Sequence, residues 1–368
     1  MISQMKKKVA LCLFLLGLSF WSMGAIVPDS TGQKKRLSLT PFPAFFVSPE
    51  NGVGYGALVV PVYNFGHDSL TRSSNGQLLG YLTTKKQSSL QLTYNIYTNQ
   101  ERYVISGEAK YFNYPIYYYG IGNQNVPSDS SLISYKFLNF QTRILRQVRK
   151  YVFVGGQFQV NRLRDLTYKN PNSRIKDRPA GELDGSVIAG IGPALLFDNR
   201  DNPLNTRQGL YAEFGAYFNR KGLGSEFSFN RYVLDVRRFW PLSDHQVLAL
   251  QGLGRFSSGQ VPFREMALLG STRIMRGFYE GRFRDRQLLA LQGEYRHQVF
   301  SRLGFVLFGS TGRVSNQIKD MGISAMKYAG GGGLRLMLNR KEKLNIRIDY
   351  AIGTDKSSGL YFEIGEAF

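Results

Sequence analysis

The strongest constraint on the fold is a two-residue alternation of apolar with polar or small side chains. It runs through residues 90–96, 210–218, 231–237 and 345–352. This period is typical of β-strands, whose successive side chains point to opposite faces, and helical spacing fits it poorly. In a soluble sandwich the apolar face is the inner one. In a membrane barrel the apolar face meets lipid and the polar face lines the lumen, so a single strand does not distinguish the two.

Strand length and the order of the connections favour the barrel. Segments of about ten residues have the length that a tilted strand needs to cross a bilayer. The longest connections fall at 113–130, 164–182 and 258–285, and they alternate with short turns. Outer-membrane barrels combine short periplasmic turns with long outer loops. We therefore predict an all-β fold, a single transmembrane antiparallel β-barrel of about 16 strands with both termini on the periplasmic side.

The last expected strand ends the chain on an aromatic residue. Leu360, Phe362 and Ile364 share one face of this strand with Phe368, which we interpret as a C-terminal barrel signal. The expected strands lie near residues 36–47, 52–64, 76–86, 88–97, 101–112, 131–147, 150–163, 183–197, 208–220, 226–240, 245–257, 286–299, 303–314, 325–338, 343–353 and 358–368.

We expect the first 25 residues to be a cleavable signal peptide, which leaves residues 26–368 as one barrel domain in the bacterial outer membrane. Three lysines precede an apolar run from Val9 to Trp21, which is too short to cross a bilayer as a helix. No later run approaches the roughly 18 apolar residues of a helical span. The single cysteine, Cys12, lies within the expected signal, so a disulfide framework and a thiolate metal site are excluded.

Six local motifs follow one another in the C-terminal half of the chain. The first is a turn that contains Asp198, Arg200, Asp201 and Pro203, with Gly209 opening the next strand. The others are Arg276-Gly277-Phe278, Gln292 to Arg296, Gly330 to Arg335, Arg347 to Tyr350 and Glu363 to Phe368.

In this order the motifs resemble the barrel of the BamA/TamA-type outer-membrane assembly superfamily, also called bacterial surface antigens. The resemblance implies insertion or assembly of outer-membrane proteins, or polypeptide translocation, with client polypeptides as partners. It also implies that the turn at Asp198 is periplasmic and that Arg276 pins a lid loop at about 258–285. The family's periplasmic POTRA repeats, which collect clients, have no expected counterpart in this chain.

Odd and even positions of a strand face opposite sides of the barrel wall, and this strand parity predicts which side chains lie near the lid. Three carboxylates and three guanidinium groups are expected to face the lumen: Glu294, Asp349, Glu363, Arg296, Arg335 and Arg347. An arginine fork at Arg276, folded into the lumen, would pair bidentately with such a carboxylate. Gly277 would permit an unusual backbone at the hinge, and Phe278 would pack on the wall. The alternative is a solvated outer loop with unrelated charges.

The excess of 47 Lys and Arg over 26 Asp and Glu leaves several functions open. A basic lumen attracts anions, and basic outer loops would bind lipopolysaccharide phosphates beside the outer-membrane lipid. A solvated basic surface explains the charge equally well. The alternatives to an assembly factor are therefore a passive, porin-like channel with a basic lumen and a structural surface protein. No groove-reading motif indicates nucleic-acid binding, and the oligomeric state stays open.

Catalysis is not expected. The three histidines are His67, His245 and His297, and none shares a strand face with a serine that it could activate. Three histidines and one cysteine also leave little for a metal site. We predict no catalytic residues, no metal and no cofactor.

Overall fold

The computed structural model describes residues 37–63, 71–126, 128–168, 185–339 and 343–368. The expected signal peptide at 1–25 lies outside them, as does His67. The first eight barrel strands are β1 (Leu37–Ser48), β2 (Gly52–Tyr63), β3 (Ser74–Thr83), β4 (Ser88–Tyr97), β5 (Tyr103–Tyr118), β6 (Ser131–Arg149), β7 (Val152–Tyr168) and β8 (Ser186–Asp198). The other eight are β9 (Gly209–Asn219), β10 (Phe229–Ser243), β11 (Gln246–Gly259), β14 (Gln287–Gln298), β15 (Leu303–Ser315), β16 (Lys327–Asn339), β17 (Leu344–Gly353) and β18 (Ser357–Ile364).

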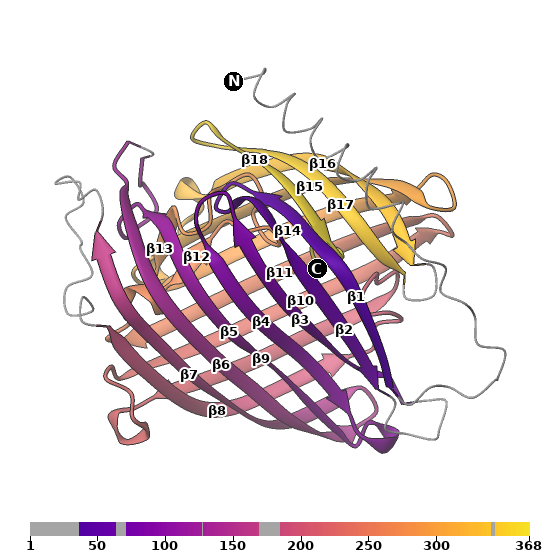
Figure 1. Ribbon diagram of the computed structural model, residues 1–368, viewed down its shortest axis with the longest axis horizontal. Coiled ribbons are helices and arrows are strands. Elements are labelled where there is room, and N and C mark those ends of the chain that lie inside the picture. The colour runs from indigo at the N-terminus through magenta and orange to yellow at the C-terminus, as the bar shows by residue number, and fades with distance from the viewer. Residues whose placement is uncertain (1–36, 64–70, 127, 169–184, 340–342) are drawn as a thin grey trace.

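These sixteen strands close into one antiparallel barrel, which confirms the predicted fold class. Each strand pairs with its neighbour in the chain, and β1 meets β18 to complete the ring. Figure 1 shows β1, in indigo, beside the yellow C-terminal strands. None of the helices among the described residues is long and apolar enough to cross a membrane.

The alternation in the sequence separates the outer face from the lumen. On β14, Leu288 and Ala290 are buried inside the barrel, whereas Leu289 and Leu291 are 37% and 49% exposed on the outside. Outward-facing leucines of this kind suit contact with lipid, because an apolar band surrounds a membrane barrel. The same parity turns the side chain of Glu294 into the lumen.

Two strands extend well beyond the ends that the sequence predicted. The strand expected at 101–112 continues to Tyr118, and the one expected at 150–163 continues to Tyr168. Tyr118 is completely buried in an aromatic and aliphatic cluster beyond the expected strand ends, where the ring of Phe263 packs against it edge-on at 5.7 Å. This packing stabilises extra strand residues that the sequence assigned to loops.

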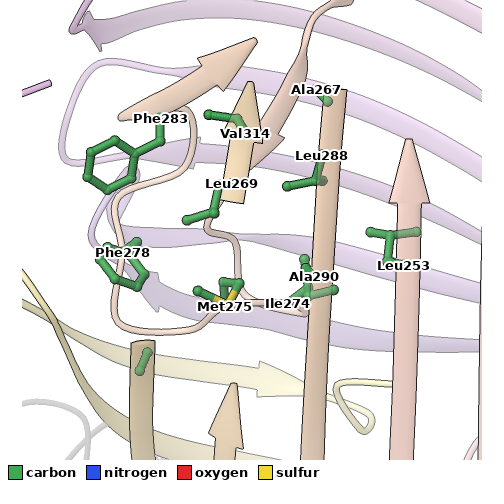
Figure 2. Packing of buried hydrophobic residues seen from close by; sticks show 11 residues of the cluster. Leu253, Ala267, Leu269, Ile274, Met275, Phe278, Phe283, Leu288, Ala290 and Val314 are labelled. Atoms are coloured by element: carbon green, nitrogen blue, oxygen red, sulfur yellow. The ribbon is translucent and has the colours of Figure 1, made fainter. Parts of the chain in front are cut away.

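The connection between β11 and β14 folds inside the barrel. It contains η3 (Phe263–Glu265) and a small two-stranded sheet of β12 (Ala267–Leu269) and β13 (Phe283–Asp285). We call residues 260–286 the lid loop. Figure 2 shows Met275 and Phe278 on its turn, packed in a buried cluster with the wall residue Leu288. The other short helices lie in turns: η1 (Asn99–Glu101), η2 (Lys221–Leu223), η4 (Ile318–Asp320) and η5 (Ile323–Ala325).

The junction of β1 and β18 differs from the others. β17 and β18 are aligned along their length, from Ile346 opposite Ile364 to Gly353 opposite Ser357. Among the described residues, β1 and β18 are aligned only where Val47 lies opposite Phe362. We call this junction the seam. It has fewer aligned residue pairs than any other junction between barrel strands in the described part of the chain.

Candidate functional site

Arg276 lies at the centre of the lid loop and inside the barrel wall. Its guanidinium donates to the Asp349 carboxylate on β17 at 2.5 Å and also to the Glu294 carboxylate on β14. All three side chains are buried, and the guanidinium carbon lies 3.6 Å from the centre of the Phe308 ring. One side chain of the lid therefore joins three strands of the wall.

Further ion pairs extend this contact into a charge-balanced network. Arg335 joins Asp349 to Glu366 at 2.6 and 2.8 Å, and Arg347 joins Asp349 to Glu363 at 3.0 and 2.6 Å. The network consists of Arg276, Arg296, Arg335 and Arg347 with Glu294, Asp349, Glu363 and Glu366. Four positive and four negative groups leave no net charge, which suits a buried cluster because an unpaired buried charge is costly.

The predicted lumen partners divide into two groups. Glu294 and Asp349 contact Arg276 directly. Glu363 pairs with Arg347 instead, and no contact with Arg276 is found among the described residues. Arg296 holds the second oxygen of Glu294 at 2.7 Å. Thus two of the three expected carboxylates are partners of Arg276, and the third stabilises a neighbouring arginine.

Gly277 and Phe278 attach the lid to β18 and to the end of β17. The Gly277 backbone has a φ of +110°, a region that favours glycine, and its N–H donates to the Tyr361 hydroxyl at 2.8 Å. The Ser357 hydroxyl donates to the Gly277 carbonyl at 2.5 Å. Phe278 is buried, and its ring packs directly on Gly353. A side chain at position 353 would collide with this ring.

The lid also reaches the other side of the seam. Three residues after Gly277, the N–H of Glu280 donates to the Glu50 carboxylate at 2.6 Å. Glu50 lies in the turn between β1 and β2, where its carbonyl accepts a hydrogen bond from Gln87 at 3.2 Å. Residues 277–280 of the lid therefore bridge β18 and the β1–β2 hairpin across the weakly paired seam.

Glu50 is a titratable group in this bridge. It is 7% exposed, and burial raises the pKa of its carboxyl to about 7, with a further rise from the nearby Glu280 carboxylate. A carboxyl with this pKa changes its charge near neutral pH. We therefore expect the contact between the lid and the hairpin to depend on pH.

The turn motif after β8 forms a compact hydrogen-bonded structure. Asp198 accepts from Arg200 at 2.8 Å and from Arg72, in the segment before β3, at 3.0 Å. Asp201 accepts the N–H of Arg207 at 3.0 Å, and Gly209 opens β9 with a φ of +119°. Arg200 and Asp201 are thereby fixed to their own turn. No described hydrogen bond involves Pro203.

The expectation for the C-terminus was wrong in one respect. β18 ends at Ile364, and Gly365 takes a φ of +93° that turns the remaining residues into the lumen. Phe368 packs against Phe239 with ring centres 6.0 Å apart, and its main-chain oxygen accepts from Arg296 at 2.9 Å. Its ring therefore does not share the lipid-facing side of β18. A two-residue period does not reveal a strand end at a positive-φ glycine.

Sequence reasoning missed Glu50, Tyr361, Ser357 and Glu366. Tyr361 and Glu366 had a usable signal, because Glu366 lies in the closing motif and Tyr361 lies two residues before it. Glu50 had none, since it lies 230 residues from its partner Glu280. Among the described residues, no cluster of three or more His, Cys, Asp or Glu is placed to hold a metal ion.

Residues 69–368 match the Omp85 superfamily domain. The chain belongs to the Omp85 superfamily. This confirms the BamA/TamA-type assignment made from the motifs. Members of the family are transport and assembly barrels of the bacterial outer membrane rather than enzymes. No curated protein matches the chain.

Solved structures share the fold at low sequence identity. BamA from Haemophilus ducreyi lacking POTRA domains 1–3 superposes with a TM-score of 0.58 at 12% identity, covering 90% of this chain and 70% of that one. CdiB from Acinetobacter baumannii gives 0.56 at 12% identity, with 90% and 65% covered. CdiB from Escherichia coli gives 0.59 at 9% identity, with 91% and 63% covered. The chain thus spans less than two thirds of either CdiB.

Proposed function

We propose that this Omp85 barrel inserts β-barrel proteins into the outer membrane or translocates polypeptides across it, with client polypeptides as its partners. The observation that carries the proposal is the seam between β1 and β18, where Val47 and Phe362 are the one aligned pair among the described residues. Separation of this seam exposes two rows of main-chain N–H and C=O groups. A client strand pairs with such edges by β-augmentation.

The lid supports the same proposal by controlling the seam. Its residues 277–280 bind Tyr361 on one side and Glu50 on the other, so the docked lid favours the closed barrel. Undocking the lid removes both contacts at once. The seam is then held only by the pairing of β1 with β18 near Val47 and Phe362. The lid holds the seam closed through contacts that undocking removes. Such an arrangement suits a barrel that opens between β1 and β18 for a client.

A passive channel is less well supported by the same features. The lid loop lies in the lumen and is fixed by buried ion pairs, whereas a steady conductance needs an unobstructed path. Planar-bilayer recordings distinguish the two. A large, constant, anion-selective current from the unmodified protein would favour the channel over the assembly factor.

The decisive test combines depletion with a reversible lock on the seam. Depletion of the protein, followed by quantitative proteomics of outer membranes, should lower the abundance of client barrels or of translocated polypeptides. The depleted cells are then supplied with Val47→Cys/Phe362→Cys in a Cys12→Ser background. Cα atoms of directly opposed residues in antiparallel strands lie about 4.5–5.5 Å apart, within the range that a disulfide spans. Oxidation should reproduce the depletion defect, and reduction should relieve it.

The matched control is Tyr350→Cys/Leu360→Cys, an opposed pair on the fully aligned β17 and β18. Its disulfide joins strands that the proposal leaves together, so client abundance should stay normal. An unchanged proteome on depletion would overturn the proposed function. Normal client abundance with the seam disulfide formed would overturn the seam as the route.

A further inference from the structure

A cavity of about 180 Å³ lies at the end of the barrel opposite the Glu50 turn. Its wall comes from the β14–β15 and β16–β17 hairpins, the start of β11 and the turn after β8. We call it the rim pocket. Both histidines that the structure describes, His245 and His297, line it. No residue of the lid loop lines it, but Arg296, Arg335 and Glu366 of the ion network form part of its wall.

The rim pocket carries a strong excess of positive charge. Its cationic lining residues are Arg207, Arg296, Arg302, Arg335 and Lys343. Glu366 is the one carboxylate in the described lining. It is already engaged, because it accepts from Arg335 at 2.8 Å and from Asn345 at 2.6 Å. Arg296 and Arg335 are balanced by carboxylates of the ion network, so the excess charge that favours an anion comes from Arg207, Arg302 and Lys343.

Two buried guanidinium groups supply unused hydrogen-bond donors to this cavity. Arg296 is 7% exposed and Arg335 is 5% exposed. The Nη1 atom of Arg296 and the Nη2 atom of Arg335 are buried and have no hydrogen-bond partner among the described residues. A buried donor without a partner is costly. Both atoms belong to side chains that line one cavity, so a single multi-oxygen anion could satisfy both.

The number of cationic side chains around the cavity favours a phosphate, because a phosphate offers more oxygen acceptors than a carboxylate. Guanidinium forks match the oxygens of phosphate or carboxylate in pairs. The pocket also has an apolar margin, where Leu303 and Phe305 belong to the outward-facing side of β15. Leu303 is 49% exposed on that side. A ligand with a phosphate head and an acyl tail fits a basic cavity that meets the lipid-facing surface.

We propose that the rim pocket binds the phosphate of an anionic phospholipid at the membrane boundary. The inference goes beyond the proposed function and does not depend on it. In this arrangement Arg296 and Arg335 donate to the phosphate from the lumen side, while Arg302 and Lys343 approach from the two hairpins. The acyl chains lie along Leu303.

The test measures lipid binding to the purified full chain by native mass spectrometry from detergent micelles. The probes are phosphatidylglycerol, which is anionic, and phosphatidylcholine, which carries no net charge. Calorimetric titration with inorganic phosphate distinguishes a free phosphate from a lipid headgroup. The variant is Arg302→Gln/Lys343→Gln, because neither residue belongs to the buried ion network. The control is Lys221→Gln/Lys319→Gln, which removes two charges from η2 and η4 at the other end of the barrel.

We expect the rim variant to bind phosphatidylglycerol about tenfold more weakly, as the loss of one charged hydrogen bond produces. The control should bind like the unmodified protein, and phosphatidylcholine should bind weakly to all three. If the protein bound inorganic phosphate but neither lipid, and the rim variant lost this binding, the pocket would still be a phosphate site. Its ligand would then be free phosphate. Equal binding of both lipids, or equal phosphatidylglycerol affinity in the rim variant and the control, would overturn the proposal.

Discussion

The backbone N–H of Glu280 donates to the carboxylate of Glu50 at 2.6 Å, and this bond joins the lid loop to the first hairpin of the barrel. The two residues are 230 positions apart in the chain. On the opposite side of the seam, Gly277 donates to Tyr361 at 2.8 Å. The closed state of the seam is therefore tied to the docking of four consecutive lid residues.

Lid docking should depend on pH through Glu50. With the lid docked, burial raises the pKa of Glu50 from its ordinary value of 4.5 to about 7. We expect undocking to expose this carboxyl and return its pKa toward the ordinary value, so that the undocked lid releases a proton. Docking is then strongest at acid pH and weakens as pH rises through about 7. The full effect is up to about 3 kcal/mol, at roughly 1.4 kcal/mol per pKa unit. Hydrogen exchange of the lid peptide that contains residues 277–280 should be slower at pH 5 than at pH 8, after correction for intrinsic rates.

Glu50→Gln provides the matching variant, because the amide keeps an oxygen acceptor for the Glu280 N–H but does not ionise. In this variant the protection of the lid should lose its pH dependence and remain high at pH 8. Glu226→Gln, which removes a carboxylate from the turn before β10, should retain the pH dependence of the unmodified protein. Equal pH dependence in both variants would assign the effect to another group.

Arg276→Ala should release the lid and leave the barrel folded. The substitution leaves Glu294 and Asp349 with their other arginines, so we expect a loss of about 2 kcal/mol in docking rather than the larger cost of a stranded charge. Trypsin should then cut the chain at Arg282 or Arg284, and the heat-modifiable gel shift should persist because the strand ladder is unchanged. Arg273→Ala, three residues earlier in the same loop, removes the same charge from a position exposed to the lumen. If trypsin cleaved the Arg276→Ala and Arg273→Ala variants at the same rate, the proposed role of Arg276 would be contradicted.

A double-mutant cycle should separate the direct partners of Arg276 from its neighbours. Arg276 contacts Asp349 but not Glu363, although the sequence made both equal candidates. The cycle of Arg276→Ala with Asp349→Asn should show a coupling of about 1 kcal/mol or more, since contacting residues are rarely additive. The cycle with Glu363→Gln should be close to additive. Lid protection measured by hydrogen exchange gives the free energies, and a larger coupling for Glu363 would refute the assigned pairing.

The sequence predicted the barrel well because lipid and lumen impose a strict alternation on every strand. Strand parity also placed Glu294, Asp349 and Arg335 on the correct face, since side-chain direction follows from position alone. Parity does not give the distance between side chains on different strands. Strand parity therefore does not predict that Arg276 contacts Asp349 and not Glu363.

The features that the sequence did not reveal depend on tertiary contacts or on backbone torsion. The contact of Glu50 with Glu280 needs the lid to fold back to the first hairpin, and no local pattern records this. The inward turn after Ile364 depends on the positive φ of Gly365, whereas the apolar period continues to Phe368. The extra length of β5 comes from packing at Tyr118, which the Tyr-rich segment alone does not distinguish from a loop.

The orientation of the barrel can be tested by labelling two exposed positions in intact cells. Ile323 lies in η5 between β15 and β16 and is 82% exposed, and Phe300 lies in the turn between β14 and β15 and is 67% exposed. Long connections such as the lid loop share the end of Ile323, and outer-membrane barrels place their long loops outside. In a Cys12→Ser background, a membrane-impermeant maleimide added to cells should label Ile323→Cys and not Phe300→Cys. Both variants should react after the outer membrane is permeabilised, which controls for accessibility. Labelling of Phe300→Cys alone in intact cells would reverse the orientation and would place the rim pocket at the cell surface.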